Sequence, residues 1–244
     1  MGIVPAVKEP KILTLDSSSF SGGVALSRGD SLVAESLLNL RSTHSENLLH
    51  QIDAVLKHAG WCMSDLDLLA AVNGPGSFTG LRIGIATLKG LAQVLNKPVA
   101  AVSSLQAVAM NLPLLEVPIC VFLDARKKEV YSQLFEWQRT GPTAVGEPVV
   151  ASPERLLREL RGRVALVGDG VPVYRALIDQ ILADRALLPV STAHQLRASQ
   201  AAWLAHQLWK KGMVMKPAEL LPTYIRPSDA ELNLPAKHCP GSAG

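Results

Sequence analysis

The feature of this sequence that most restricts its fold is a pattern that occurs twice. An apolar β-type segment ending in aspartate is followed by a tight turn and a second β-type segment. Residues 11–16 (KILTLD) precede a segment at 22–28, and residues 118–124 (PICVFLD) precede one at 129–136. This composition favours strands. We interpret the repetition as a weak internal duplication, which predicts two related lobes with a boundary near residues 108–117.

Alternating strands and helices follow the opening of each half. In the first half we expect a third strand at 31–38, a helix at 43–59, a strand at 67–73, a helix at 79–95 and a strand at 99–103. In the second half we expect a helix starting at Ser152–Pro153, a strand at 164–170, and helices near 171–183 and 194–211. A meander followed by such units predicts a mixed sheet covered by helices.

These elements divide the chain into three parts. Residues 1–109 are expected to form the first lobe, with the helix near 194–212 packing back on it. Residues 110–193 form a second, smaller lobe. Residues 213–244 are expected to be an extended C-terminal tail that runs over the surface and frays, because the stretch after Lys216 is rich in proline.

Composition excludes several classes of protein. None of the apolar runs reaches the roughly 20 residues of a membrane helix, so no membrane association is expected. Cys62, Cys120 and Cys239 are far apart and form no CxxC, which favours the reducing cytoplasm. The net charge of +3 permits contact with RNA but does not argue for it. We interpret the basic run 126–128 as a solvated turn.

Two loops could belong to a nucleotide site. Asp16-Ser17-Ser18-Ser19 follows the first strand, and an aspartate with backbone amides in a tight turn can hold a phosphate and its metal. Composition alone favours an ordinary turn. Gly168 and Gly170, after a strand of the second half, could let an adenine approach the backbone, or could form a plain strand–helix turn.

The run GPGSFTGLRIG at 74–84 joins a strand to a helix but lacks the GK[ST] of a phosphate-binding loop. The helix that follows carries Gly80, Gly84, Ala86 and Gly90, and each glycine costs about 1 kcal/mol relative to alanine. Some other interaction must compensate for this cost in helix stability. The sequence therefore predicts close packing of another helix against this surface, inside the domain or across a subunit interface.

No catalytic residue or metal site is predicted. His44 and His50 are six residues apart, which is not the spacing of a zinc helix, and the sequence contains neither HExxH nor GxSxG. Glu46 has a structural explanation instead, because it can form a capping box with Thr43 at the start of a helix.

Several longer segments occur together in an order that is typical of one family: ILTLDSS, THSENLLHQID, VNGPGSFTGLRIGIATLKGLAQVL, PVAAVSSLQAVA, LDARKKEVY and PTYIR. In this combination, which spans roughly residues 11–226, the chain resembles the TsaB (YeaZ) family and, more distantly, the TsaD family. The resemblance implies an α/β, actin-like (ASKHA, ribonuclease H-like) two-lobe fold with mixed sheets flanked by helices.

The resemblance also implies a role. TsaD transfers a threonylcarbamoyl group to N6 of adenosine 37 in tRNAs that read ANN codons. TsaB-like proteins pair directly with TsaD through helices of the first lobe, and the ATPase TsaE and the tRNA join through the complex. They form homodimers when alone. The family role is that of a scaffold without catalysis, so no cofactor is required and at most weak ATP or ADP binding is expected.

Two sets of residues follow from this resemblance. The expected partner interface lies on the helices at 43–59 and 79–95 and comprises His44, Leu48, Ile52, Gly80, Arg82, Ile83, Gly84 and Thr87. The expected degenerate nucleotide cleft comprises Asp16, Ser17, Ser18, Asp124, Gly168 and Gly170. We expect Arg82 to meet a partner carboxylate. Gly84→Leu is expected to abolish partner binding and to leave a folded monomer.

The non-catalytic reading rests on two departures from the catalytic relatives. TsaD carries an HxEGH-type stretch whose two histidines hold a metal, whereas Ser104 and Val108 stand in the corresponding places here. Neither side chain replaces an imidazole ligand well. Asp16-Ser17-Ser18 also replaces the Asp-x-Gly start of the wider superfamily. The alternatives are an ATP-binding actin-like enzyme (kinase or carbamoyl transferase) that is active by itself, a glycoprotease and a stand-alone tRNA-binding module.

Overall fold

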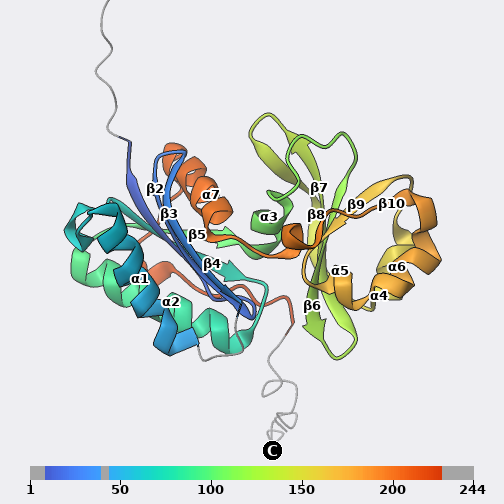
Figure 1. The fold of residues 1–244 in the computed structure, drawn as a ribbon, viewed down its shortest axis with the longest axis horizontal. Helices are drawn as coiled ribbons and strands as arrows, with labels where there is room; N and C mark the ends of the chain where they lie inside the picture. Colours follow the sequence, from blue (N-terminus) through green and yellow to red (C-terminus); the bar gives the residue numbers. More distant parts are fainter. Residues whose placement is uncertain (1–8, 40–43, 227–244) are drawn as a thin grey trace, which may run out of the picture.

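The computed structural model describes residues 9–39 and 44–226, with side chains from residue 48 onward in the second range. Two five-stranded sheets lie side by side (Figure 1). The first sheet has the order β3-β2-β1-β4-β5. Its strands are β1 (Lys11–Asp16), β2 (Ser21–Arg28), β3 (Ser31–Asn39), β4 (Leu68–Gly74) and β5 (Val99–Ser103). The pairs β1–β2 and β2–β3 are antiparallel, and the pairs β1–β4 and β4–β5 are parallel.

The second sheet repeats this topology. Its order is β10-β9-β6-β7-β8, with β6 antiparallel to β7 and parallel to β9, as β1 is to β2 and β4. Its strands are β6 (Ile119–Arg126), β7 (Glu129–Gln138), β8 (Gly141–Ala151), β9 (Val164–Val167) and β10 (Ala186–Leu187). The internal duplication predicted from the two aspartate-ended strands is thus confirmed at the level of topology.

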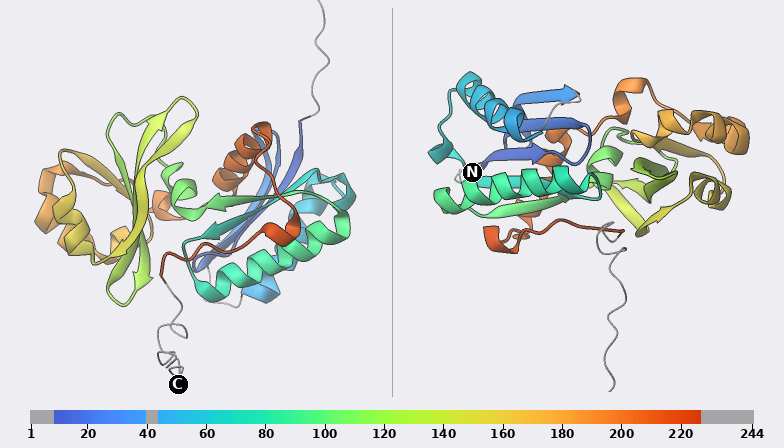
Figure 2. Two further views of the ribbon diagram at one scale, coloured as in Figure 1. Left: turned by 180° about the vertical axis from the view of Figure 1, so that it is seen from behind. Right: turned by 90° about the horizontal axis from the view of Figure 1, so that it is seen from below.

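Helices cover both faces of the first sheet (Figures 1 and 2). On one face lie α1 (His44–Ala59) and α2 (Phe78–Leu95), and on the other lies α7 (Ala198–Lys210). The alternation of side chains along the strands explains this arrangement. Leu13 and Leu15 of β1 join the apolar cluster beneath α1 and α2, whereas Ile12 joins the cluster that includes Leu204 of α7.

The core beneath α7 continues into the second lobe. One apolar cluster contains Ile12 and Leu68 of the first sheet together with Ile119, Phe135 and Val167 of the second. The short helix α3 (Ser104–Ala109) connects the sheets and buries most of its side chains in the same cluster. The lobes are therefore joined by shared hydrophobic burial as well as by the chain itself.

The second lobe carries the shorter helices α4 (Pro153–Glu159), α5 (Gly170–Val173) and α6 (Arg175–Leu182). The expected helix at 171–183 is thus divided in two. The strand β8 was not predicted, because its segment contains Pro142 and Pro148 and exposes most of its side chains, as an edge strand can. The helix expected from residue 194 begins at Ala198, after a 3-10 turn at Ser191–His194.

The prediction of a fraying tail is wrong for residues 217–226. Residues 213–226, which we call the C-terminal strap, run back along the first lobe (Figure 2). Met215 pairs with Val99 of β5, Leu220 is fully buried, and the Thr223 amide donates to the Asn73 carbonyl at 2.7 Å. Specific hydrogen bonds and core burial hold this segment in place despite its prolines. Residues 227–244 lie outside the described ranges, as does the Thr43 cap.

Two further expectations concern the membrane and the thiols. No helix within the described ranges has the length and apolarity that crossing a membrane requires. Cys62 and Cys120 are free thiols, and burial raises the pKa of Cys120 to about 11. Cys239 lies outside the described residues.

Candidate functional site at the junction of the lobes

The loop after β1 holds a buried carboxyl group. Asp16 is fully buried, and its Oδ1 accepts hydrogen bonds from the Ser18 amide at 2.9 Å and the Ser18 hydroxyl at 2.7 Å. Its Oδ2 has no hydrogen-bond partner among the described residues. Burial raises the pKa of Asp16 to about 6, against the lowering effect of the Ser18 hydrogen bonds and with a further increase from Asp169.

The corresponding loops of the second lobe face this aspartate. The Asp124 amide donates to Asp169 Oδ1 at 2.9 Å, and Asp124 also forms an ion pair of 3.1 Å with Arg126. Burial, together with the nearby Asp124 carboxylate, raises the pKa of Asp169. The structure thus brings Asp16, Asp124 and Asp169 to one junction. Asp169 lies within the predicted glycine motif, but its charge was not singled out from the sequence.

The glycines of this junction have a packing explanation. A Cβ added at Gly168, where φ is +124°, would collide with the Phe122 carbonyl oxygen, and one at Gly170 would lie 2.9 Å from the same atom. These contacts favour the strand–helix turn over the adenine-binding alternative. No group of three or more His, Cys, Asp or Glu side chains that could hold a metal occurs among the described residues.

The predicted role of Gly80 and Gly84 in the partner interface is wrong. Both are buried, and it is the loop after β1 that approaches them. A Cβ at Gly80 would collide with the Ser17 carbonyl oxygen, and one at Gly84 with Ser17 Oγ, which donates to the Gly80 carbonyl at 2.8 Å. The close approach that the glycines predict therefore exists, but inside the lobe. Gly84→Leu would disrupt this packing and is no clean probe of partner binding.

The predicted interface residues of α1 are also misplaced. Leu48 and Ile52 are 2% and 1% exposed and belong to the core beneath the helix. Their helical periodicity marks the face that packs on the sheet rather than a docking surface. The structure gives the backbone of His44 at the start of α1 but not its side chain.

The remaining predicted interface residues lie on the outer side of α2. Ile83 and Thr87 are half-buried, and Arg82 is exposed. The Arg82 guanidinium lies 3.8 Å from the centroid of the Phe78 ring, and its Nε donates to the Tyr224 hydroxyl at 3.2 Å. Arg82 therefore already has partners within the chain. The stripe that α2 presents to solvent is instead formed by Ile83, Ala86, Gly90 and Val94, spaced three or four residues apart.

The two positions that the resemblance to TsaD singled out in the sequence are filled by core packing. Ser104 and Val108 of α3 are both fully buried. The Ser104 hydroxyl donates to the Pro75 carbonyl at 2.5 Å, and Val108 belongs to the apolar cluster shared by the lobes. This hydrogen bond ties α3 to the glycine-rich loop before α2.

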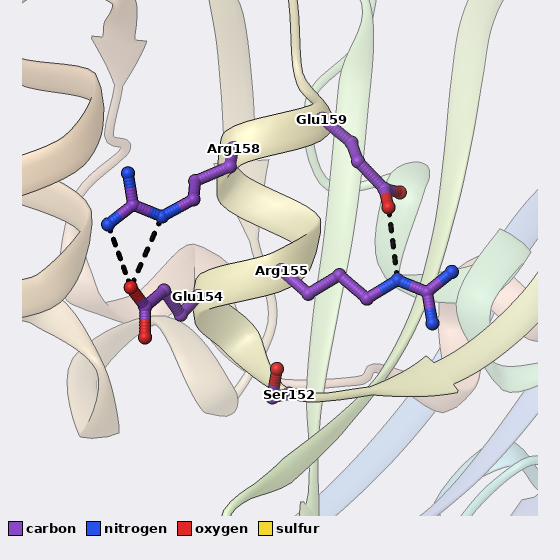
Figure 3. A pocket seen from close by; sticks show the side chains of 5 residues that line it. All are labelled: Ser152, Glu154, Arg155, Arg158 and Glu159. Carbon is purple, nitrogen blue, oxygen red and sulfur yellow. Dashed lines mark hydrogen bonds and ion pairs between the residues drawn. The ribbon is translucent and has the colours of Figure 1, made fainter.

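A surface pocket on the second lobe carries no comparable arrangement. It is lined by Ser152 and four charged residues of α4 (Figure 3). Arg158 pairs with Glu154 at 2.8 Å and Arg155 pairs with Glu159 at 3.0 Å, each one helical turn apart. These charges satisfy one another on an exposed helix, which is the usual role of such pairs.

Comparison with known proteins relates this architecture to one family. Residues 35–234 match the family described as TsaD, tRNA N6-adenosine threonylcarbamoyltransferase. The tRNA threonylcarbamoyladenosine biosynthesis protein TsaB of Bacillus subtilis is 29% identical over 227 residues, which cover 90% of this chain and 96% of that protein. Its Escherichia coli namesake is 29% identical over 239 residues, covering 93% and 99%.

Comparison with solved structures agrees with the relationship found by sequence. YeaZ from Pseudomonas aeruginosa superposes with a TM-score of 0.77 at 29% identity, covering 88% of this chain and 99% of that one. The ethanolamine utilization protein EutJ from Carboxydothermus hydrogenoformans, at 10% identity and a TM-score of 0.52, shares the fold alone. With the two mixed five-stranded sheets, these likenesses confirm the actin-like two-lobe fold predicted from the sequence.

Proposed function

We propose, from the premise that this chain belongs to the TsaB/YeaZ family, that it is a non-catalytic partner subunit in the formation of N6-threonylcarbamoyladenosine in tRNA. In this proposal the chain pairs directly with a TsaD-type transferase in the cytoplasm, while TsaE and the tRNA join through the complex. The assembly modifies adenosine 37 in tRNAs that read ANN codons, and the chain contributes to this reaction only as part of the assembly. It pairs with itself when the transferase is absent.

The absence of catalysis is supported best by α3. The resemblance places Ser104 and Val108 where the catalytic relatives carry metal-binding histidines, and both side chains are fully buried in the core. A neutral hydroxyl and an isopropyl group supply no Lewis-acid site. The transferase partner therefore supplies the reaction centre.

The docking face we propose differs from the one the sequence suggested. It is the stripe of Ile83, Ala86, Gly90 and Val94 on α2, flanked on α1 by Leu49. Val94 is 86% exposed and Leu49 is 54% exposed, which is unusual for large apolar side chains on a helix pair. Ala86 and Gly90 leave space for a partner helix to approach closely. The same face serves the homodimer.

Gly90→Arg is the variant that tests this face. A Cβ at Gly90 meets no atom within 4 Å, so the substitution fits the monomer and raises helix propensity. We expect it to leave the monomer folded and to abolish the complex with TsaD, because a long cation would stand where a helix must approach. Ala176→Arg, at an exposed alanine of α6 in the second lobe, is the matched control.

Light-scattering chromatography with and without TsaD measures the outcome. The unchanged chain and Ala176→Arg are expected to form a one-to-one complex in place of a self-dimer. A Gly90→Arg chain that still binds TsaD would rule out this face, and an unchanged chain that forms no complex would contradict the scaffold role itself.

We propose that the junction of the lobes binds ATP or ADP weakly and does not hydrolyse ATP. Ser17 packs against α2 rather than leaving a phosphate-sized turn, and Asp16 is buried with its pKa raised. Burial therefore opposes the ionised form of Asp16, which is the form that binds a metal. We expect no steady phosphate release from ATP by the isolated chain. Sustained turnover that follows the protein peak on a sizing column would instead support a self-sufficient enzyme.

A further inference from the structure

The strap ends beside the β6–β7 turn, at the junction of the two lobes (Figure 1). Aromatic and cationic side chains are in contact with one another there. We call this group the junction patch: Phe20, Phe78, Arg82, Arg126, Lys127, Lys128, Tyr224 and Arg226. From the sequence alone, three of these residues form a solvated turn and most of the others have no role. The structure brings together four separate segments to form the patch.

Ring contacts and hydrogen bonds link the four segments in a closed series. Phe78 stacks on Tyr224 with ring centroids 4.9 Å apart. Two residues further along the strap, Arg226 donates to the Ala125 carbonyl at 3.2 Å and to Glu129 at 2.7 Å.

Contacts of the loop after β1, in the first lobe, complete the series. The Arg126 guanidinium lies 4.4 Å from the centroid of the Phe20 ring. Phe20 belongs to the loop after β1, and the Ser18 carbonyl of that loop accepts a hydrogen bond from the Ser77 amide at 2.7 Å, directly before Phe78. These contacts therefore connect the four segments of the patch across both lobes.

The β6–β7 turn is built from residues that its backbone does not favour. Arg126, Lys127 and Lys128 have φ values of 63°, 51° and 61°. This left-handed region favours glycine and asparagine, and a hairpin turn with both central residues there typically carries Asn-Gly. Three consecutive cations in this conformation are locally unfavourable. Such a conflict between residue type and backbone is typical of functional positions.

The charges and rings of the patch suit a nucleic acid. Asp124 pairs with Arg126 and Glu129 pairs with Arg226, so these four charges offset one another. The formal positive charge of the patch then comes from Arg82, Lys127 and Lys128. Phe20 is 53% exposed and Tyr224 39% exposed, each beside a guanidinium. Interleaved aromatic rings and cations bind single-stranded nucleic acid, because rings stack on bases while cations pair with phosphates.

We propose that the junction patch binds an unpaired loop of RNA, with Phe20 and Tyr224 stacking on bases and the Lys127–Lys128 turn contacting phosphates. This inference rests on the proposed function, which supplies a tRNA as the RNA that meets the assembled complex. It adds a direct contribution of this chain to substrate binding, in place of contact through the other subunits alone.

A double substitution tests the turn without damaging the fold. Lys127→Asn with Lys128→Gly places the residues that the backbone favours and removes both charges, so the variant is expected to be at least as stable as the unchanged chain. Phe20→Ala removes an exposed ring. The control is Arg163→Gln with Lys211→Gln, which removes two exposed charges. Arg163 precedes β9 at the opposite end of the second sheet from the turn.

The probe is a fluorescently labelled, unmodified tRNA that reads an ANN codon, titrated with the TsaD-bound complex over a range of salt concentrations. We expect the turn variant to bind about tenfold more weakly and its log–log salt slope to fall by about 1.4, since each phosphate contact in single strands contributes about 0.7. Phe20→Ala is expected to weaken binding about fivefold or more at an unchanged slope. The control should match the unchanged complex.

Three outcomes would overturn the inference. Unaltered affinity and slope in the turn and Phe20 variants would show that the patch does not touch the RNA. An equal loss in the control would assign the effect to net charge alone. Displacement of the tRNA by excess ATP would assign the patch to a nucleotide. Chromatography of the same samples separates these results from failure of the proposed function, in which the unchanged chain would not bind TsaD at all.

Discussion

Gly80→Ala is expected to lower the free energy of unfolding by about 3 kcal/mol or more, whereas Gly90→Ala in the same helix is expected to raise it by about 1 kcal/mol. The added methyl group at Gly80 collides with the Ser17 carbonyl, a backbone atom that can move only with the loop after β1. The methyl group at Gly90 meets no atom within 4 Å. Urea unfolding of the three proteins measures both differences.

Gly84 supplies an intermediate case. Its added Cβ would meet Ser17 Oγ, which belongs to a side chain and can rotate away or be removed. Gly84→Ala is therefore expected to destabilise the protein less than Gly80→Ala, and Ser17→Ala is expected to rescue part of the loss. If Gly80→Ala were as stable as Gly90→Ala, the loop would not pack on α2 as described.

Asp16→Asn is expected to raise the free energy of unfolding by about 2 kcal/mol at pH 8 and to change this free energy little at pH 4. The pKa of Asp16 is about 6 in the folded protein, against an ordinary value of 3.8. The folded state therefore holds a proton that the unfolded state has released. The contribution of Asp16 to the free energy of unfolding is fully present below about pH 4. It falls by about 3 kcal/mol as the pH rises to about 6, and above that pH it is constant.

The asparagine side chain keeps an oxygen for the two Ser18 hydrogen bonds and carries no charge to bury. Its amide group lacks an identified acceptor beside it, since Asp16 Oδ2 has no partner among the described residues, and this offsets about 1 kcal/mol of the gain. Urea unfolding at pH 4, 6 and 8 measures the effect, with Asp184→Asn at an exposed position as control. A destabilised Asp16→Asn at pH 8 would mean that the ionised carboxylate is held by a cation, which would favour a functional nucleotide cleft.

The family and the fold both followed from local sequence. The segments 11–16 and 118–124 are mostly apolar and end in aspartate, and their repetition is visible in the sequence without any tertiary information. The helices α1 and α2 were predicted within one residue at each end. Elements of this kind are determined by composition and periodicity, which depend on neighbours along the chain.

The edge strand and the strap could not be predicted in this way. β8 is mostly exposed and contains two prolines, and it is ordered by pairing with β7 and by a hydrogen bond from Gln106 Nε2 of α3 to the Pro142 carbonyl at 3.0 Å. The strap has no periodicity, and hydrogen bonds to β4 and burial of Leu220 hold it in place. The strap depends on partners that are distant in sequence, whereas β8 forms a hairpin with β7 that its prolines and exposed side chains conceal.

What the sequence by itself determined was the presence of close packing at the glycines of α2, the duplicated lobes and the family. Which surface those glycines faced was decided only by the tertiary structure, because a small residue permits close approach without specifying what approaches. The same holds for Leu48 and Ile52, whose spacing marks an apolar face but cannot tell core from interface. Likewise, the basic turn at 126–128 became a candidate RNA contact only once the fold placed Phe20 and the strap beside it.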